Sequence, residues 1–322
     1  MCYSAQVKAD YLKYVRTYGA TLDIAEFYKL FWERRYNDKG KVPKVPKAME
    51  LAFAHPQTER EREIKALIDE YNAAEATRLE QELFKQRKRL ADAQRSLQTK
   101  TTKAAQESQR IATTKIDATL QRLADLRRTE LLERDGRIFP GLYAPVIVME
   151  NGQRMVRPMR YQCRPAGKPA AYDTKYPGTY NARRDNLGGF WKELFGFSHG
   201  VLVVNAFYEN VSRHAMEHRE LRPDEKPENV VLEFRPQPQQ DMLVACLWSR
   251  WVAPGEPELL SFAAITDEPP PEIAAAGHDR CIIPIKPENL DAWLNPQRGR
   301  LDALQAILED RDRPYYEHRM AA

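Results

Sequence analysis

The chain contains few cysteines, and their spacing excludes several classes of protein. Its 322 residues include four, none of them in a Cys-x-x-Cys pair: Cys2, Cys163, Cys246 and Cys281. This scatter excludes a zinc ribbon and does not indicate a disulfide framework. The sequence also lacks an apolar run long enough to span a bilayer, and residues 1–6 lack the layout of a signal peptide. We therefore expect a cytoplasmic protein with no membrane segment.

A large excess of charge of either sign is also missing. Charged residues make up 30% of the chain, but its formal net charge is only +4. This balance permits a polyanionic partner such as nucleic acid without requiring one. A hydrophobic content of 43% over this length is enough for a buried core in one large domain, or in one domain with an extension.

Residues 1–56 are expected to form the helical N-terminal part of the main domain. Apolar residues recur at helical spacing over 11–15 and again over 24–31. Thr21 is a candidate N-cap for the second helix, because acidic residues would then fall in the first turn. The two prolines within 41–47 end this regular pattern.

Residues 57–135 contain neither glycine nor proline and are rich in Glu, Lys, Arg, Gln and Ala. Two apolar stripes are separated by the Thr-rich segment 99–102. The first comprises Ile64, Leu67, Tyr71 and Ala74, continued with gaps by Leu79, Leu83, Leu90 and Leu97, and the second comprises Ile111, Ile116, Leu120, Leu123 and Leu126. We predict two long helices in an antiparallel coiled-coil hairpin, with one uninterrupted helix as the alternative. Such an arm is either a solvated structural element or a surface for a protein partner, for self-association or for tracking DNA.

Residues 136–322 are expected to form the main, β-rich domain. Short apolar runs bounded by turn residues predict strands at 144–149, 200–205, 230–234, 242–248, 259–266 and 281–285. Helical patterns are confined to 287–294 and 298–308. The fold class is therefore α+β: a curved antiparallel sheet or barrel-like core with flanking helices, plus the inserted hairpin.

Cys2 follows the initiator methionine, and removal of that methionine would make it the amino terminus. It would then carry an amine and a thiol on adjacent carbons. The amine condenses with an aldehyde to an imine, and the thiol closes on the imine carbon to give a five-membered thiazolidine. Because an α-amine has a pKa of about 7.7–8.0, a useful fraction of it is neutral at pH 7. Met1-Cys2 alone is too common to indicate this chemistry.

Three further motifs each place a polar residue of catalytic type beside a turn or a strand end: Asn181-Ala-Arg183, Phe207-Tyr-Glu209 and His278-Asp-Arg280. Together with Met1-Cys2, and in this order, they resemble the SOS response-associated peptidase (SRAP) family, the abasic-site processing proteins. The resemblance covers residues 1 to about 20 and about 137–295. It is supported by Phe190-Trp-Lys192, Phe139-Pro140 and Met159-Arg-Tyr161.

The resemblance implies that Cys2 is a nucleophile that crosslinks to the aldehyde of abasic sites in single-stranded DNA. The same residue would remove Met1, and β-elimination from the imine would give a secondary lyase activity. The catalytic set that the family pattern implies is Cys2, Asn181, Glu209 and His278. Asn181 would orient the amino terminus or the substrate, Glu209 would act as general acid and base, and His278 would assist proton transfer. Neither a metal nor a cofactor is implied.

The resemblance also assigns contacts with DNA. Arg183 is expected to hold a phosphate, with Arg160 and Lys192 as further candidates. The candidates for stacking on bases are Phe190, Trp191 and Tyr161. The sequence departs from the family pattern at Tyr3, Gln162, Asn205-Ala206 and Asn210, and in the helical insertion.

Two other classes of function stay open on sequence alone. His214-Ala-Met-Glu-His218 matches H-x-x-E-H, in which His214 and His218 share a helix face and bind zinc while Glu217 acts as base. However, Arg222-Pro223 would end that helix early, and no third ligand is identifiable downstream. The other alternative is a non-catalytic interaction protein that acts through the coiled-coil arm.

Overall fold

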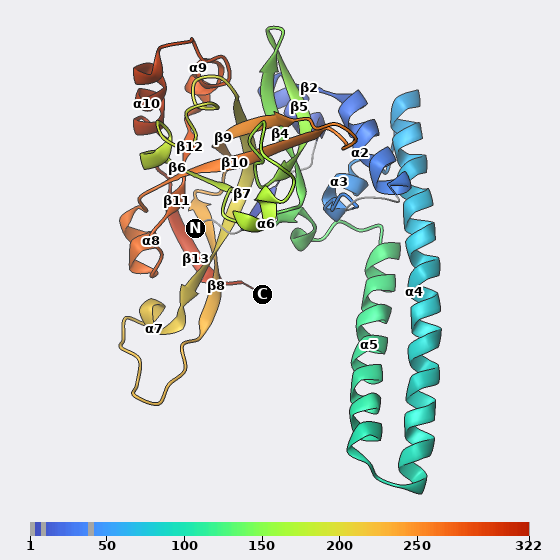
Figure 1. Ribbon diagram of the computed structural model, residues 1–322. Coiled ribbons are helices and arrows are strands. Elements are labelled where there is room, and N and C mark those ends of the chain that lie inside the picture. Colours follow the sequence, from blue (N-terminus) through green and yellow to red (C-terminus); the bar gives the residue numbers. More distant parts are fainter. Residues whose placement is uncertain (1–3, 8–10, 38–41, 322) are drawn as a thin grey trace. The chain divides into compact units, whose positions relative to one another are not determined.

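The computed structural model describes residues 4–7, 11–37 and 42–321 (Figure 1). The chain divides into two compact units. A β-rich unit comprises Met1–Leu30, Pro43–Ala52 and Leu132–Ala322, and a helical unit comprises Phe31–Val42 and Phe53–Leu131. No helix over the described residues is both long enough and apolar enough to cross a membrane.

Over the described residues, thirteen strands of the β-rich unit form one sheet. In chain order they are β1 (Ser4–Val7), β2 (Thr21–Leu22), β3 (Arg137–Ile138), β4 (Tyr143–Glu150), β5 (Gln153–Tyr161), β6 (Asn181–Arg183), β7 (His199–Ser212), β8 (Asn229–Gln237), β9 (Met242–Trp251), β10 (Leu259–Asp267), β11 (Cys281–Ile282), β12 (Pro284–Ile285) and β13 (Tyr315–Met320). All six predicted strand regions are strands, although the 281–285 run is divided between β11 and β12.

Successive pairings close part of the sheet into a ring. β9 pairs with β10, β10 with β5, β5 with β4, β4 with β7, and β7 again with β9. All of these pairs are antiparallel except β10 with β5. Apolar side chains from these strands form one buried cluster, which includes Val146, Leu202, Val244 and Phe262. The predicted α+β fold with a barrel-like core is therefore confirmed.

The long strand β7 connects this ring to the rest of the sheet. Its first half, from His199, lies in the ring against β4 and β9. Its second half pairs with β1 on one edge and with β8 on the other, and β8 continues to β13. The register of β1 against β7 shifts between Gln6 and Val7, opposite Asn205, which marks a β-bulge.

Short helices flank the sheet. They are α1 (Tyr11–Tyr18), α2 (Ile24–Tyr36), α3 (Lys47–Leu51), α6 (Tyr172–Lys175), α7 (Arg213–Met216), α8 (Pro271–Ala275), α9 (Leu290–Leu294) and α10 (Leu301–Glu309), with 3-10 turns η1 (Glu133–Gly136), η2 (Arg184–Asn186) and η3 (Pro287–Asn289). Two N-terminal expectations were wrong. The segment Ser4–Val7 is a strand, and Thr21 lies in β2, so Asp23 accepts the hydrogen bond from the Glu26 N–H in the first turn of α2.

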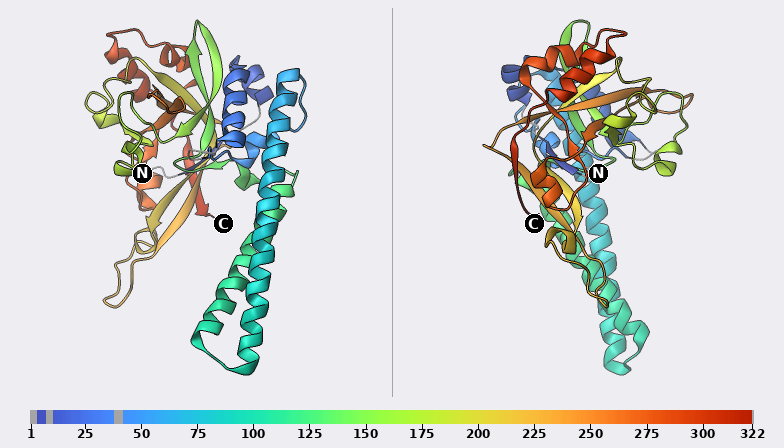
Figure 2. Two further views of the ribbon diagram at one scale, coloured as in Figure 1. Left: turned by 45° about the vertical axis from the view of Figure 1, so that its right-hand side comes forward. Right: turned by 90° about the vertical axis from the view of Figure 1, so that its left-hand side faces the viewer.

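The helical unit contains the predicted antiparallel hairpin, built from α4 (Glu59–Thr99) and α5 (Lys103–Arg127), which lie side by side in every view (Figures 1 and 2). Thr58 caps α4 in a capping box with Glu61, and Thr102 caps α5. Leu79, Leu83 and Leu123 form the apolar cluster between the helices. Leu120, which was expected in this stripe, is instead 41% exposed.

Candidate active site

A buried carboxylate and an imidazole meet beside the second half of β7. Glu209 pairs across the sheet with Leu232 of β8, between the pairs Phe207–Phe234 and Val211–Val230. In a sheet, cross-strand partners and residues two positions apart on one strand point to the same face. The Glu209 carboxylate therefore points among the apolar side chains of these pairs, and it is fully buried. His278 Nε2 lies 3.2 Å from Glu209 Oε2. A carboxyl group in such surroundings requires polar partners, and His278 supplies one.

Gly277 places His278 at this position. Helix α8 ends at Ala275, and Gly277 then takes a left-handed conformation with φ of 91°. A Cβ at this residue would lie 3.2 Å from the Cβ of Ala215. The turn directs His278 back under the sheet, where its N–H donates to the carbonyl of Ile273 at 3.3 Å. The left-handed backbone angle therefore favours glycine at this position, and the nearby Ala215 leaves little room for a side chain.

Both ring nitrogens of His278 have polar neighbours. Its Nδ1 lies 2.8 Å from the carbonyl oxygen of Arg280 and also accepts a hydrogen bond of 3.2 Å from the Arg280 N–H, so the tautomer decides the role of this nitrogen. Nε2 lies beside a carboxyl oxygen of Glu209, where a shared proton can reside on either group. Burial lowers the pKa of His278, which favours its uncharged form. The pair is thus able to donate and accept protons within one buried contact.

Asn181 is buried but has an unused amide. It lies on β6, which pairs in parallel with β10, opposite Ala264. The residue is 7% exposed, and neither Oδ1 nor Nδ2 has a hydrogen-bond partner among the described residues. Buried amide groups nearly always have partners, so the hydrogen-bonding capacity of this one is available to a molecule that enters from outside. It lines a pocket of about 370 Å³.

The same pocket contains three further residues that the sequence singled out: Arg183, Phe190 and Trp191. Phe190 is 43% exposed, and its ring packs edge to face on the buried Trp191. Arg183 is exposed and forms an ion pair with Asp185. The pKa of the Arg183 guanidinium is raised by its hydrogen bond to Asp185 and also by the charge of Asp279. That electrostatic coupling links the pocket rim to the loop that carries His278.

Other predicted DNA contacts are placed differently. Arg160 lies on β5 and forms an ion pair of 2.7 Å with Asp173 of α6, which also binds Arg164. Hydrogen bonds from both arginines hold the pKa of Asp173 below its usual value, against the opposing effect of burial. Tyr161 is 2% exposed and stacks on Phe262. Lys192 is exposed and does not line the pocket.

Several pocket residues were not anticipated. Tyr172, Lys175 and Tyr176 come from α6 and the residue after it, and Asn186 comes from η2. The Asn186 side chain accepts a hydrogen bond from the Phe190 N–H at 3.1 Å, so it fixes the loop that presents this ring. In the sequence this wall is marked by two tyrosines four residues apart, Tyr172 and Tyr176.

Cys2 lies outside the described residues. Ser4, two residues later in the chain, pairs with Tyr208, the neighbour of Glu209 on β7. The Ser4 hydroxyl also accepts a hydrogen bond of 3.2 Å from Arg137 Nε. Strand β1 is therefore fixed beside the carboxylate from its first described residue.

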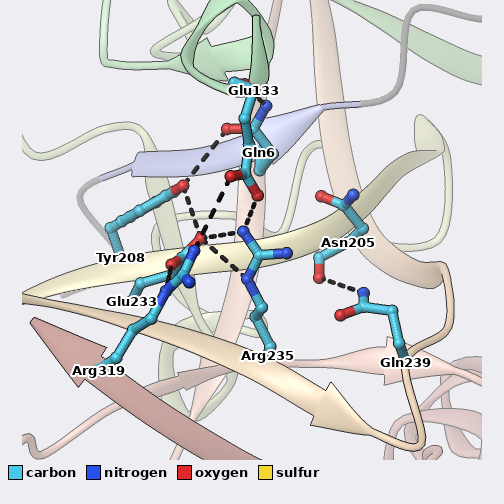
Figure 3. Close-up of polar contacts among 8 residues, drawn as sticks. All are labelled: Gln6, Glu133, Asn205, Tyr208, Glu233, Arg235, Gln239 and Arg319. Carbon is cyan, nitrogen blue, oxygen red and sulfur yellow. Dashed lines mark hydrogen bonds and ion pairs between the residues drawn. The ribbon is translucent and has the colours of Figure 1, made fainter. Parts of the chain in front are cut away.

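The opposite face of β7 carries a dense polar network (Figure 3). The buried Glu233 carboxylate accepts hydrogen bonds from the Tyr208 hydroxyl and from Arg235, each at 3.0 Å, and it also pairs with Arg319 of β13. The Tyr208 hydroxyl lies 3.4 Å from Gln6 Oε1, which ties β1 to the same network. This cluster had no signal in the sequence motifs.

The H-x-x-E-H motif does not form a zinc site of the expected kind. Helix α7 covers only Arg213–Met216, and His218 has a left-handed φ of 51°, so the two histidines do not share a helical face. Glu217 forms ion pairs with Arg213 and Arg219. Among the residues that the structure describes, no group of three His, Cys, Asp or Glu side chains is placed to hold a metal ion.

Comparison with known proteins gave one family. A family model described as SOS response associated peptidase (SRAP) matches residues 99–321, a range that contains Asn181, Glu209 and His278. No match was found among curated proteins.

Three solved structures are also similar to this chain. One is a protein from Bordetella bronchiseptica, with 15% identity over 58% of this chain and 87% of the other, and a TM-score of 0.46. The second is from Bacteroides thetaiotaomicron, with 13% identity over 60% and 80% and a TM-score of 0.46. The third is a phage-related protein from Bordetella bronchiseptica, with 18% identity over 58% and 81% and a TM-score of 0.42.

Proposed function

The chain belongs to the SOS response-associated peptidase (SRAP) family, and from this premise we propose that it crosslinks through Cys2 to abasic sites in single-stranded DNA. Family membership relates the chain to the SOS response. The observation that carries the finer proposal is the buried contact of 3.2 Å between Glu209 and His278. A proton-sharing pair of this kind has no obvious structural purpose and suits acid–base chemistry.

The chain connection supports Cys2 as the reacting residue. Only two peptide steps, each of about 3.8 Å between Cα atoms, separate Cys2 from Ser4. Ser4 pairs with Tyr208, directly beside Glu209. From this short connection we infer that the amine and thiol of Cys2 can reach the buried carboxyl group.

The remaining cysteines are unsuited to the reaction. Cys163, Cys246 and Cys281 are all buried. Burial raises the pKa of the Cys163 thiol to about 12, and it raises the pKa values of the other two thiols as well. Because the thiolate is the nucleophilic form, these three side chains are poor nucleophiles at neutral pH. This leaves Cys2 as the cysteine for covalent chemistry.

The proposed reaction uses each group in turn. The neutral amine of Cys2 adds to the aldehyde carbon, and a proton from the Glu209–His278 pair allows the resulting hydroxyl to leave as water. The nitrogen then returns its remaining proton to the pair, which leaves a neutral imine. The thiol then adds to the imine carbon, and its proton passes to the nitrogen, which completes the thiazolidine. Loss of a proton from the sugar carbon next to the imine would instead give β-elimination and strand scission, the lyase outcome. Asn181 is proposed to orient the reactants with its unpartnered amide.

Removal of Met1 is proposed to use the same centre. The Cys2 thiol attacks the carbonyl carbon of Met1, the acyl group moves from nitrogen to sulfur, and the nitrogen gains the thiol proton. Water then hydrolyses the thioester and releases methionine. The pocket beside Asn181 would meanwhile hold the DNA, with Arg183 on a phosphate and Phe190 on a base.

The test is a denaturing gel with a single-stranded oligonucleotide that contains one abasic site. Processed protein should give a heat-stable shifted band, which an intact oligonucleotide should not give. Cys2→Ala should abolish the band, whereas Cys163→Ala, a matched change of a buried thiol, should leave it unchanged. Glu209→Gln should slow both crosslinking and Met1 removal. A heat-stable band with Cys2→Ala would refute the proposal.

Borohydride separates the amine from the thiol. Cys2→Ala cannot remove Met1 by this route, so a methionine aminopeptidase is used to expose the α-amine of its second residue. That amine should form an imine that borohydride reduces to a stable secondary amine. Cys2→Ala should therefore crosslink only with borohydride present, whereas the wild type should crosslink without it. If borohydride traps nothing on Cys2→Ala, the amine is not the group that meets the aldehyde.

A further inference from the structure

The helical arm distributes its charge very unevenly along its length. We call residues 59–82 the proximal part and residues 83–117 the distal part. The proximal part has eight acidic and four basic residues, whereas the distal part has nine basic and three acidic residues. The distal excess of six positive charges exceeds the net charge of +4 of the whole chain. The cationic character of this protein is therefore concentrated in the distal part.

Ion pairing makes the contrast between the two parts sharper. Each of the four basic residues of the proximal part has a carboxylate partner on the same helix, at 2.5–2.7 Å: Arg60, Arg62, Lys65 and Arg78. In the distal part only Arg95 and Arg110 are paired in this way. The distal cations that are exposed and have no carboxylate partner among the described residues are Lys85, Arg87, Lys88, Lys100, Lys103 and Lys115. These charges are available to an external anion.

The distal part presents these cations on a stable surface. Ala93, Ala105 and Ala112 are buried between α4 and α5, and such small side chains allow the two helices to approach closely. A groove of about 540 Å³ between the helices is lined by Lys85, Lys88 and Arg89. Arg89 Nε donates a hydrogen bond of 2.9 Å to Ser108 Oγ, which braces the groove across the hairpin.

An exposed aromatic ring stands among these cations. Phe84 is 74% exposed, whereas its neighbour Leu83 is buried against α5. Residues three and four positions later on a helix are surface neighbours, so Arg87 and Lys88 flank the ring. Surfaces that bind single-stranded nucleic acid combine backbone-tracking cations with aromatic rings on which bases stack. Duplex DNA offers no such exposed base, so the ring favours a single strand.

We propose that the distal part of the arm is a second binding surface for single-stranded DNA. Its unpaired cations hold backbone phosphates, and Phe84 stacks on an unpaired base. The choice of DNA as the nucleic acid rests on the proposed function. The surface itself is separate from the pocket around Asn181 and needs no abasic site. It would raise the local concentration of DNA for a reaction that takes place elsewhere on the protein.

The test uses the full chain and an intact, fluorescently labelled single strand in an anisotropy titration. The variant Lys85→Gln/Arg87→Gln/Lys88→Gln removes three of the unpaired cations around Phe84 and leaves the Arg89–Ser108 hydrogen bond intact. The matched control, Arg60→Gln/Arg62→Gln/Lys65→Gln, removes the same charge from the proximal part. Gln is a good helix former, and circular dichroism checks that the helix content is unchanged.

The distal variant should bind on the order of 10- to 100-fold more weakly at 0.1 M salt, since each phosphate contact contributes about −0.7 to the salt slope. The proximal variant should bind like the wild type. Phe84→Ala should weaken binding to the single strand roughly 5- to 100-fold and leave binding to a duplex of the same length unchanged. Equal affinity of the distal and proximal variants would overturn the proposal. If the distal variant binds more weakly but Phe84→Ala has no effect, the partner of this surface is a duplex or an acidic protein and not a single strand.

Crosslinking keeps this proposal distinct from the proposed function. At saturating protein, the distal variant should crosslink an abasic oligonucleotide at the wild-type rate, because Cys2 is untouched. Loss of crosslinking with Cys2→Ala and unchanged binding of the intact strand would support both proposals. Arm-dependent binding without any crosslinking by the wild type would reject the Cys2 chemistry alone.

Discussion

His199 is expected to make the β-rich unit lose stability in mild acid. This residue starts β7, and both of its ring nitrogens are used in the interior. Nε2 accepts a hydrogen bond from the Gly196 N–H at 2.8 Å, and Nδ1 donates to the Trp293 carbonyl at 3.0 Å. The ring also packs 4.0 Å from the Trp293 ring, centroid to centroid. Burial lowers the pKa of His199 to about 3, so the folded protein holds it uncharged.

The sign and size of the effect follow from this pKa. In the unfolded chain the imidazole titrates at about 6.5, so between pH 6.5 and 3 the unfolded state binds one more proton than the folded state. Stability from this residue is complete above pH 6.5 and decreases as the pH falls, by up to about 1.4 kcal/mol per unit. From pH 7 to pH 5 the free energy of unfolding should decrease by about 2 kcal/mol from this residue alone.

Urea unfolding at pH 7, 6 and 5 measures the effect, with tryptophan fluorescence as the probe because four of the five tryptophans lie in the β-rich unit. His199→Gln keeps a donor and an acceptor but does not titrate. The variant should be less stable at pH 7, yet it should lose about 2 kcal/mol less than the wild type on going to pH 5. Other titrating groups cancel in this difference. Parallel pH profiles, or an NMR titration of His199 near pH 6.5, would refute the reasoning.

Two substitutions test the site. Asn181→Ala should leave the melting temperature within about 2 °C of the wild type, because removing an amide without hydrogen-bond partners costs little stability, while the crosslinking rate falls by on the order of 10-fold. Scanning fluorimetry measures the melting temperature, and the gel assay measures the rate. A large loss of stability would contradict the interpretation that this amide has no structural role. Gly277→Ala should lower the free energy of unfolding by about 1–2 kcal/mol, because its φ is left-handed, and should slow crosslinking by displacing His278. Unchanged stability and rate in urea unfolding and gel assays would show that this turn does not position the imidazole.

The apolar strands and the hairpin were predictable because their burial leaves a regular pattern in the sequence. Strands β4, β9 and β10 are buried along most of their length and read as continuous apolar runs. Helix α4 ends and helix α5 begins at the Thr-rich segment that separates the two stripes. In each case the spacing of apolar residues along the sequence reflects which side of the strand or helix is buried.

The strands that escaped prediction owe their polarity to distant partners. Strand β5 contains Arg154, Arg157 and Arg160, which pair with carboxylates far along the chain or on another element. Strand β13 is exposed along most of its length, and its sequence lacks an apolar run. An ion-pair partner many residues away leaves no pattern in the sequence around the strand. Only the fold therefore shows why charged side chains occupy that strand.

The site motifs were predictable individually, whereas their surroundings were not. The sequence identified both Glu209 and His278, and the structure brings them into contact. It assigned Arg160 to a phosphate, but nothing near residue 160 indicates that Asp173 of α6 would bind its guanidinium. That ion pair anchors the segment whose tyrosines line the pocket, so Arg160 also holds the pocket wall in place, and its contact with a phosphate stays a prediction.

The two faces of β7 differ in how their carboxylate neighbours are held. Tyr208 faces Glu233, whose carboxylate is satisfied by two arginines and a hydroxyl, so this side binds β1, β8 and β13 firmly together. Glu209, one residue later, points into the buried interior, where His278 Nε2 lies 3.2 Å from its carboxylate. A buried carboxyl group costs free energy unless its polar partners are held in place. The ionic network on the reverse face fixes the strand, and with it the position of Glu209 opposite His278.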